Sequence, residues 1–387
     1  MSAVAEVGKV LPPKAGDIWS DINSAAEPWW LAAPALLREI EQPRFEPQAA
    51  ASYQLGDAVL EMVADHRSLV APFPELYEDC AVDSRATGMA AVRCTMRRSF
   101  EPPLIVLRFE EGAPADAADI AHNLLRPTKA VPPFRVWDSP LPGWRLAGGA
   151  TGPILATCGA YVLLHPKLIP PEFLVEYMVG ITLGAQPGML SVHGASLLMG
   201  EAGVVLVGAS HSSKTTTSLH IAARGHTLLG DEVALIRVAT TEVVPFRRAV
   251  NLRPGPRGAE LAAVLGLEKG NGETASDEWT GRYRITELFP DRPARSAPLR
   301  AVFFLAGFAD CPSIERFQLT LDRADVFSWI TTPEIAYCSW GIAPARRAFR
   351  LLVLKELLSR IPCWLVKVGP PRDTVALIER TVEELAC

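Results

Sequence analysis

Residues 204–215 read VVLVGASHSSKT, a short apolar run followed by a loop that begins with glycine and ends with lysine and threonine. Phosphate-binding loops of the P-loop type have the form G-x-x-x-x-G-K-[ST] and connect a buried strand to a helix. Their backbone N–H groups point at phosphate oxygens, and the lysine neutralises phosphate charge. Gly208, Lys214 and Thr215 occupy the matching positions. The stretch therefore predicts a strand, a phosphate loop and a helix.

This loop departs from the full pattern at the second glycine, where Ser213 stands. That position often requires close backbone approach or torsions that cost a residue with a Cβ about 1–2 kcal/mol. The alternative is a plain strand-to-helix turn with a lysine at the start of the helix. The surrounding pattern favours the phosphate loop, because Lys214–Arg224 is helical in pattern and ends at Gly225, an expected C-terminal cap.

An acidic pair follows the next apolar segment, in Leu228-Leu229-Gly230-Asp231-Glu232, and precedes the strand-like run 233–236. A carboxylate at a strand end beside a phosphate loop can hold Mg²⁺ through water or accept a proton from a substrate hydroxyl. A solvated turn is the alternative, since Gly-Asp-Glu is common turn chemistry. Beside a phosphate loop, the functional interpretation is favoured.

His193 lies inside the apolar run 190–199, which is predicted to form a hairpin with the strand that leads to the loop. A lone histidine in a strand is more often a core residue than a catalytic group. The hairpin would nevertheless place it near the phosphate loop.

Two later segments also suggest a binding role. Arg247, Arg248 and Arg253 could contact phosphate or an acidic substrate group, although a solvated basic loop is an equal alternative. Residues 268–284 are rich in glycine and charge and are typical of a mobile loop, such as a lid.

The order of these segments resembles the HPr kinase/phosphorylase superfamily, and in particular its divergent relatives in bacterial gene clusters. The resemblance is specific over residues 190–237 and looser toward the C-terminus. It covers, in order, His193-Gly194-Ala195, the strand, the loop with Gly208, Ser210, Lys214 and Thr215, the helix, Arg224-Gly225-His226, and the segment that ends at Asp231-Glu232.

The resemblance implies an α/β (mixed α+β) fold: a P-loop core related to phosphoenolpyruvate carboxykinase, with an additional N-terminal α+β domain. It also implies ATP and Mg²⁺ as cofactors, and it is compatible with a homo-oligomer. Asp231 would be the catalytic base, His193 would lie near the transferred phosphoryl group, and Thr215 and Glu232 would hold the metal. The nucleotide would be bound by Gly208, Ser210, Ser212, Ser213, Lys214 and Thr215.

Two functions from different classes follow. The first is an ATP- and Mg²⁺-dependent kinase that phosphorylates a hydroxyl, on a serine of a peptide or protein or on a small molecule. The second is an inactive relative that binds a peptide or partner protein, for example in a peptide natural-product pathway. Its support is that His211 and Ser213 replace both inner glycines of the family's loop. The retained lysine and carboxylates favour the kinase.

Composition and net charge limit the other classes of function. The chain has 387 residues, of which 49% are hydrophobic and 21% charged, with a net charge of -5. This predicts a globular protein without a broad positive field for nucleic acid or anionic membrane. No apolar run is long enough for a membrane span, the N-terminus lacks a signal-peptide pattern, and the seven cysteines are dispersed without metal-ligand spacing. These features predict a cytoplasmic location, reduced thiols and no zinc site.

A proline-rich stretch, 126–150, is predicted to be a loop or linker, which divides the chain into domains 1–150 and 151–387. The role of the first domain is open between substrate recognition and support of the core. Trp29 and Trp30 are expected to cover a core, with a sticky arm as the alternative. Further strands are expected at Met89–Thr95, Leu104–Phe109 and Ile154–Leu164, and helices at Ala115–Leu125, Glu172–Leu183, Pro344–Ser359 and Asp373–Leu385.

Overall fold

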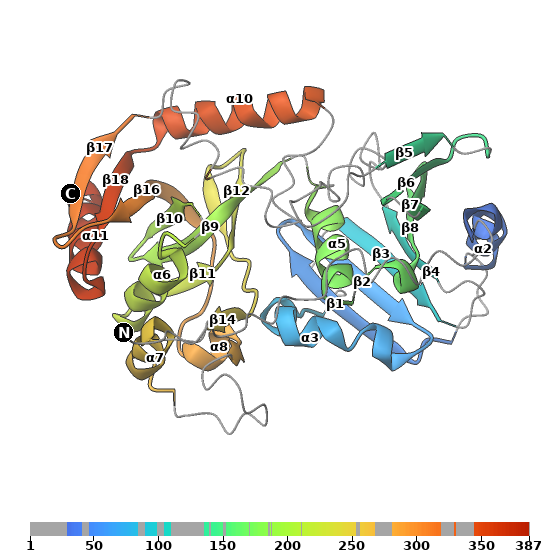
Figure 1. Ribbon diagram of the computed structural model, residues 1–387, viewed down its shortest axis with the longest axis horizontal. Coiled ribbons are helices and arrows are strands. Elements are labelled where there is room, and N and C mark those ends of the chain that lie inside the picture. Colours follow the sequence, from blue (N-terminus) through green and yellow to red (C-terminus); the bar gives the residue numbers. More distant parts are fainter. Residues whose placement is uncertain are drawn as a thin grey trace, which may run out of the picture.

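The computed structural model describes residues 29–40, 46–83, 90–98, 104–109, 135–138, 141–149, 152–169, 171–184, 186, 188–209, 211–252, 256–267, 281–318, 329 and 344–386. Two large sheets lie side by side along the long axis of the molecule, each with helices against it (Figure 1). The chain is therefore a mixed α/β protein, as its sequence pattern predicts.

The first sheet has eight strands in the order β1-β2-β3-β4-β8-β7-β6-β5, and all neighbours are antiparallel except β2 and β3. Its strands are β1 (Ala49–Leu55), β2 (Ala58–Ala64), β3 (Ala90–Arg97), β4 (Leu104–Phe109), β5 (Arg135–Asp138), β6 (Arg145–Gly149), β7 (Gly152–Cys158) and β8 (Tyr161–Leu164). The helices of this half are η2 (Trp29–Ala32), α2 (Ala33–Ile40), η3 (Arg67–Leu69), α3 (Pro72–Tyr77), η4 (Glu78–Cys80), η6 (Pro166–Leu168) and α5 (Pro171–Gly184).

Two expectations for this half are wrong. The proline-rich stretch 126–150 is not a plain linker, because it contains β5 and β6, and the single strand expected at 154–164 is the hairpin β7–β8, which turns at Gly159 with a positive φ of 54°. The division at residue 150 falls between the paired strands β6 and β7. The helix expected at 115–125 lies outside the described residues.

The second sheet is built around β10 (Ala202–Gly208), which pairs with antiparallel β9 (Met189–Met199) on one side and with parallel β16 (Ala297–Phe308) on the other. β9 also pairs with β11 (Thr227–Gly230) and β12 (Val233–Arg237). The remaining strands are β13 (Glu242–Val244), β17 (Ser313–Phe317) and β18 (Cys363–Val368), with the small pair β14 (Val250–Leu252) and β15 (Gly281–Tyr283) apart. β18 runs parallel to β16.

Helices cover both faces of this second sheet. The apolar residues of α6 (Lys214–Ala223) and α11 (Pro371–Ala386) pack on one face, and those of α10 (Pro344–Arg360) pack on the other. The shorter α7 (Pro256–Val264) and α8 (Ile285–Leu288) join the first group. Since both faces are covered, β9 is apolar and buried at almost every position, as strands buried on both faces usually are.

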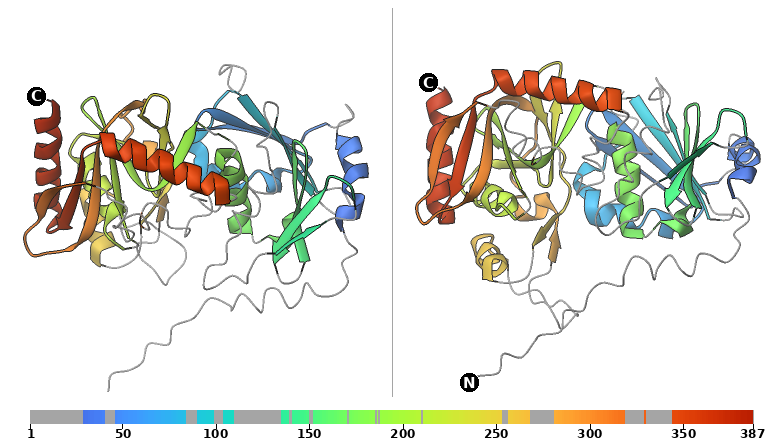
Figure 2. Two further views of the ribbon diagram at one scale, coloured as in Figure 1. Left: turned by 90° about the horizontal axis from the view of Figure 1, so that it is seen from above. Right: turned by 45° about the horizontal axis from the view of Figure 1, so that its top comes forward.

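The two sheets share one hydrophobic core, which brings together residues of β1, β2, α3 and α5 with residues of β12, β13 and the segment that follows. The rings of Tyr77 and Phe246 lie 5.7 Å apart across it. At its edge, Arg237 donates to both carboxylate oxygens of Asp57, at 2.6 and 2.9 Å. The two halves are seen against each other from two further directions in Figure 2.

The tryptophans near the start of the described chain cover a core, as expected. Trp29 is buried, and its indole Nε1 donates to the carbonyl of Pro153 at 2.9 Å. Three of the cysteines, Cys80, Cys94 and Cys363, are also buried, in agreement with a role as small core residues. None of the described helices is long and apolar enough to cross a membrane.

Candidate functional site

The loop after β10 joins a buried strand to helix α6, as the sequence predicts. Gly208 is needed there for space, because a Cβ at this position would lie 2.4 Å from Ser212 Oγ and 2.9 Å from the carbonyl oxygen of Leu305. Helix α6 ends at Ala223, and Gly225 follows the C-cap residue Arg224 with a φ of 118° that is easily adopted only by glycine. Ser210 lies outside the described residues.

The two residues that replace glycine in this loop both have left-handed backbones, with φ of 64° at His211 and 73° at Ser213. Among the described residues, only two other non-glycine residues have a positive φ, Glu232 and Thr241. Three of these four strained positions therefore lie in the loop or the acidic pair. Such conformations persist where surrounding structure enforces them, and they concentrate at binding and catalytic sites.

Lys214 begins helix α6 and turns its side chain back across the loop. Its ammonium donates to the carbonyls of Gly208 and Ala209, each at 2.9 Å, and the residue is only 9% exposed. Ser212 closes a turn by donating its backbone N–H to Ala209, and its buried hydroxyl has no hydrogen-bond partner within the described part of the chain. The lysine thus holds the loop in shape while keeping a positive charge at its centre.

The acidic pair sits in a break between β11 and β12, and it adjoins the loop. The hydroxyl of Thr215 donates to the two carboxylate oxygens of Asp231, at 3.2 and 2.9 Å. Burial of Asp231 and the charge of Glu232 raise the pKa of its carboxyl group to about 6, despite opposing effects of the Thr215 hydrogen bond and of Arg248. Asp231 is therefore a stronger base than an ordinary aspartate and is still ionised near pH 7.5.

Glu232 is held by both its backbone and its side chain. Its carbonyl accepts from the backbone N–H of Gly194 at 3.1 Å and from Nδ1 of His193 at 3.0 Å. Its carboxylate accepts from Nη1 of Arg248, which also donates through Nη2 to Glu176 on helix α5 at 2.9 Å. The guanidinium contacts one oxygen of this carboxylate, Oε2, so the ion pair fixes the group and leaves Oε1 for a further contact.

His193 adjoins the loop from β9, opposite Val233 in the register of β9 and β12. Burial and the charge of Lys214 lower the pKa of its imidazole to about 4, against the effect of the hydrogen bond with Glu232. The ring is therefore neutral at pH 7. Because a carbonyl only accepts, Nδ1 carries the proton and Nε2 is left as an acceptor.

Sequence reasoning misjudged the arginines and missed Glu176. Arg247 and Arg248 are both buried, so the interpretation as a solvated loop is wrong for them, and Arg253 lies outside the described residues. Arg247 donates to the carbonyls of Leu228 and Arg292, which is a structural role. Glu176 belongs to helix α5 and is brought in only by tertiary packing, so the local sequence carries no signal for it.

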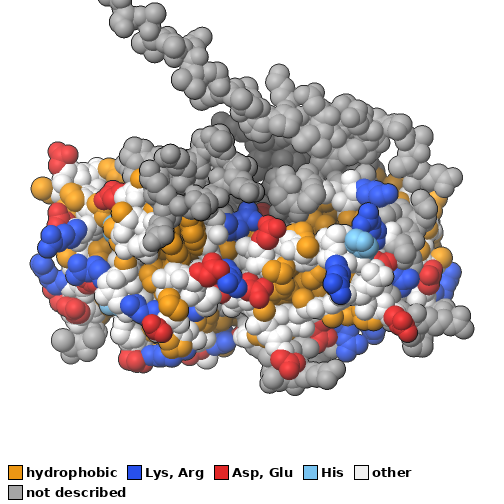
Figure 3. Space-filling view, turned by 90° about the horizontal axis from the view of Figure 1, so that it is seen from below, with side chains coloured by type: hydrophobic (Ala, Val, Ile, Leu, Met, Phe, Trp, Pro, Cys, Tyr) orange, Lys and Arg blue, Asp and Glu red, His pale blue; other side chains and the backbone are white. Residues whose placement is uncertain are grey.

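The described part of the face seen from below carries acidic and basic side chains side by side, without a large area of one sign (Figure 3). At the candidate site itself, Lys214 supplies positive charge that helps to lower the pKa of His193.

Comparison with solved structures finds 49 chains that are similar to this one. The HPr(Ser) kinase/phosphatase from Coxiella burnetii is similar to this chain with a TM-score of 0.24 and 16% sequence identity, over 50% of this chain and 88% of that one. No family model matches the chain, and no curated protein matches it. The similarity is a weak link to that kinase, and it leaves the function to be argued from the site.

Relief of the strain at Ser213 should be measurable. Ser213→Gly is expected to stabilise the protein by about 0.5–1 kcal/mol, because the left-handed conformation costs serine roughly 1–2 kcal/mol and glycine loses part of that gain in unfolded-state entropy. Ser213 makes no side-chain cap hydrogen bond that would be lost. Urea unfolding measures the change.

The matched control is Thr216→Gly, two residues into the regular part of α6, where glycine is expected to destabilise by about 0.3–0.5 kcal/mol relative to threonine. Equal destabilisation by both substitutions would contradict the strain at Ser213.

Proposed function

We propose that this protein is an ATP- and Mg²⁺-dependent phosphotransferase with a P-loop core of the HPr kinase type, acting on a hydroxyl group. The contact between the Thr215 hydroxyl and Asp231 carries the proposal. It brings a loop hydroxyl within 2.9 Å of a buried carboxylate of raised basicity, directly beside a buried loop lysine. The weak similarity to an HPr(Ser) kinase/phosphatase points the same way.

The residues fit a magnesium ion that takes most of its ligands from nucleotide phosphates. Mg²⁺ usually binds one or two carboxylates together with hydroxyls, phosphates and waters, and Glu232 and Thr215 can supply such ligands while Asp231 serves as the base. Within the described ranges, no cluster of three or more histidine, cysteine, aspartate or glutamate side chains is arranged to hold a metal. When bound, the ion supplies charge neutralisation on the transferred phosphoryl group. Glu232 would support the site through its ion pair with Arg248.

In the proposed reaction, Lys214 leaves the loop carbonyls and binds phosphate oxygens, together with the N–H groups at the start of α6. Asp231 takes the proton of the acceptor hydroxyl while that oxygen bonds to the γ-phosphorus and ADP leaves. The neutral His193 offers Nε2 as an acceptor, which can orient the same hydroxyl. The serine of a peptide or protein, or a small alcohol, would be the acceptor.

A second candidate, a non-catalytic peptide-binding relative, is favoured by one observation. The ammonium of Lys214 occupies the loop by bonding to Gly208 and Ala209, and non-glycine residues hold the loop in strained conformations. A loop whose carbonyls already accept hydrogen bonds from its own lysine could have a purely structural role.

Calorimetric titration with ATP and with a non-hydrolysable analogue, with and without Mg²⁺, separates these two functions. The kinase requires binding in the micromolar range that strengthens with Mg²⁺. Absence of binding at millimolar nucleotide would contradict the kinase and leave the peptide-binding function.

A further inference from the structure

Strand β10, which leads into the candidate phosphate loop, pairs with β9 on one side and with β16 on the other. On the β9 side lie His193 and the acidic pair. On the other side runs β16, parallel to β10, with Leu305 beside Gly208 in the register. Because the strands are parallel, the last residues of β16 reach the same sheet edge as the loop. Ligands of α/β proteins bind at such carboxyl ends.

The end of β16 is shaped irregularly. The register with β18 shifts between Leu305 and Phe308, and Gly307 in this bulge has a φ of 106° that other residues rarely adopt. Bulges next to sites redirect a side chain. Phe308 pairs with Val368, which belongs to the sheet face covered by α6 and α11. The ring therefore stands on the face where α6 begins.

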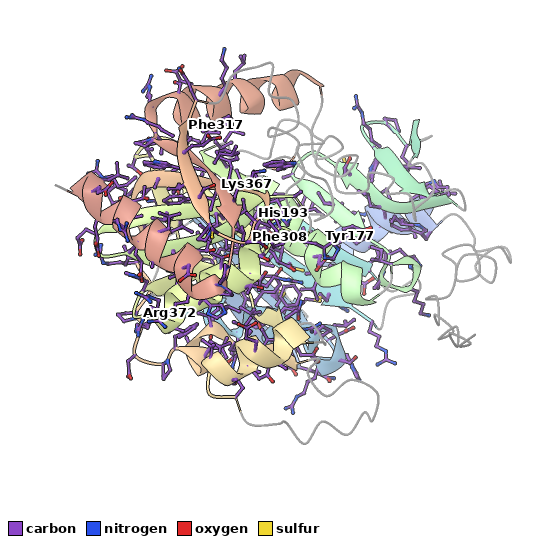
Figure 4. All side chains as sticks on the ribbon, turned by 60° about the vertical axis from the view of Figure 1, so that its left-hand side comes forward. Tyr177, His193, Phe308, Phe317, Lys367 and Arg372 are labelled. Carbon is purple, nitrogen blue, oxygen red and sulfur yellow. The ribbon has the colours of Figure 1, made fainter. Side chains whose placement is uncertain are left out.

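Phe308 exposes 53% of its surface, which is unusual for a phenylalanine at the end of a core strand. On β18, the exposed Lys367 donates its ammonium at 3.0 Å to the carbonyl of Ala306, two residues before Phe308 in β16. Figure 4 labels both side chains. An exposed aromatic ring thus stands at the end of β16, the strand that pairs with the loop strand β10.

We propose that Phe308 forms the base subsite of the nucleotide site, stacking its ring on the nucleobase of a bound nucleoside triphosphate. The inference rests on the proposed function. A nucleotide laid along the sheet edge would place its terminal phosphate toward Asp231 and His193, and its base toward β16. Stacking on an aromatic side chain contributes about 1–3 kcal/mol per base, or roughly 5–150-fold in affinity.

The test compares ATP with inorganic tripolyphosphate, both in Mg²⁺, by calorimetry on the full chain. Phe308→Ala is expected to raise the Kd of ATP by at least about fivefold while the Kd of tripolyphosphate changes less than about twofold. Phe308→Trp should retain ATP affinity. The control is Leu352→Ala, which removes a side chain that is 64% exposed on α10, on the opposite face of the sheet, and should change neither constant.

Equal affinity of the wild type and Phe308→Ala for ATP, with tripolyphosphate bound by both, would overturn the base subsite and leave the phosphotransferase intact. A parallel loss of both ligands in Phe308→Ala would also overturn it, since the ring would then support the loop. If the wild type binds neither ligand, the result contradicts both the proposed function and the base subsite.

Discussion

Asp231→Asn is expected to lower phosphoryl transfer about 100- to 10,000-fold, the usual contribution of a positioned base, while it makes the protein more stable above pH 7. The carboxylate of Asp231 is buried and accepts from Thr215. Asparagine keeps an oxygen that can accept the same hydrogen bond, but it cannot take up a proton. Release of phosphate from ATP, and transfer of label from ATP to a serine-containing peptide library, measure the loss.

The gain in stability follows from the raised pKa. The pKa of Asp231 rises from an ordinary 3.8 to about 6 on folding, so the folded state binds the proton more tightly. The tighter binding of this proton stabilises the folded state fully below pH 3.8, and the stabilisation is lost as the pH rises through 6. At pH 8 the buried charge costs roughly 3 kcal/mol, an upper estimate of the gain in Asp231→Asn. Melting curves should show an advantage of a few degrees at pH 8 that nearly vanishes at pH 4.

The neighbouring carboxylate provides the control, because its substitution should act in the opposite direction. Glu232→Gln removes the negative charge paired with the buried guanidinium of Arg248, which is 7% exposed, and is expected to destabilise by about 1–3 kcal/mol. If Asp231→Asn also destabilised the protein at pH 8, the ionised carboxylate of Asp231 would not carry the free-energy cost of burial described above.

Lys214→Ala is expected to weaken the binding of ATP at least about 100-fold. A lysine that bridges two phosphates makes charge-assisted hydrogen bonds worth roughly 1.5–3 kcal/mol each. The measurement is calorimetric titration with ATP in Mg²⁺, and loss of affinity for tripolyphosphate should match that for ATP. In the fold, the carbonyls of Gly208 and Ala209 lose a donor.

Lys355→Ala, on the exposed side of α10, removes the same charge far from the loop and serves as the control. Unchanged ATP affinity in Lys214→Ala would show that the loop does not bind phosphate through its lysine. In that case the peptide-binding function would be favoured.

The sequence predicts best the elements that local pattern determines. The apolar runs of β9 and β10, the helix from Lys214 and the two late helices all lie within a few residues of their predicted bounds. The expected strain at Ser213 is confirmed by its φ of 73°. These features depend on periodicity and on the steric demand of single residues, which a sequence displays directly.

Other features depend on contacts between distant segments, so the sequence could not reveal them. The hairpin β1–β2 had a local signal in Gly56-Asp57 between apolar runs, which could have been used. The strands β5 and β6 lack such a signal because prolines and glycines surround them. The pairing of Arg248 with Glu176 and Glu232 spans up to 72 residues and is fixed only by the shared core.

That shared core also constrains how such a chain can evolve. The core joins Tyr77 and α5 to Phe246 and β12, so each half completes part of the apolar interior of the other. A genetic recombination that exchanged the first half for an unrelated segment would leave Val233, Leu235 and Phe246 exposed to water. The two halves are therefore expected to be inherited together, and changes in one should select for compensating changes in the other.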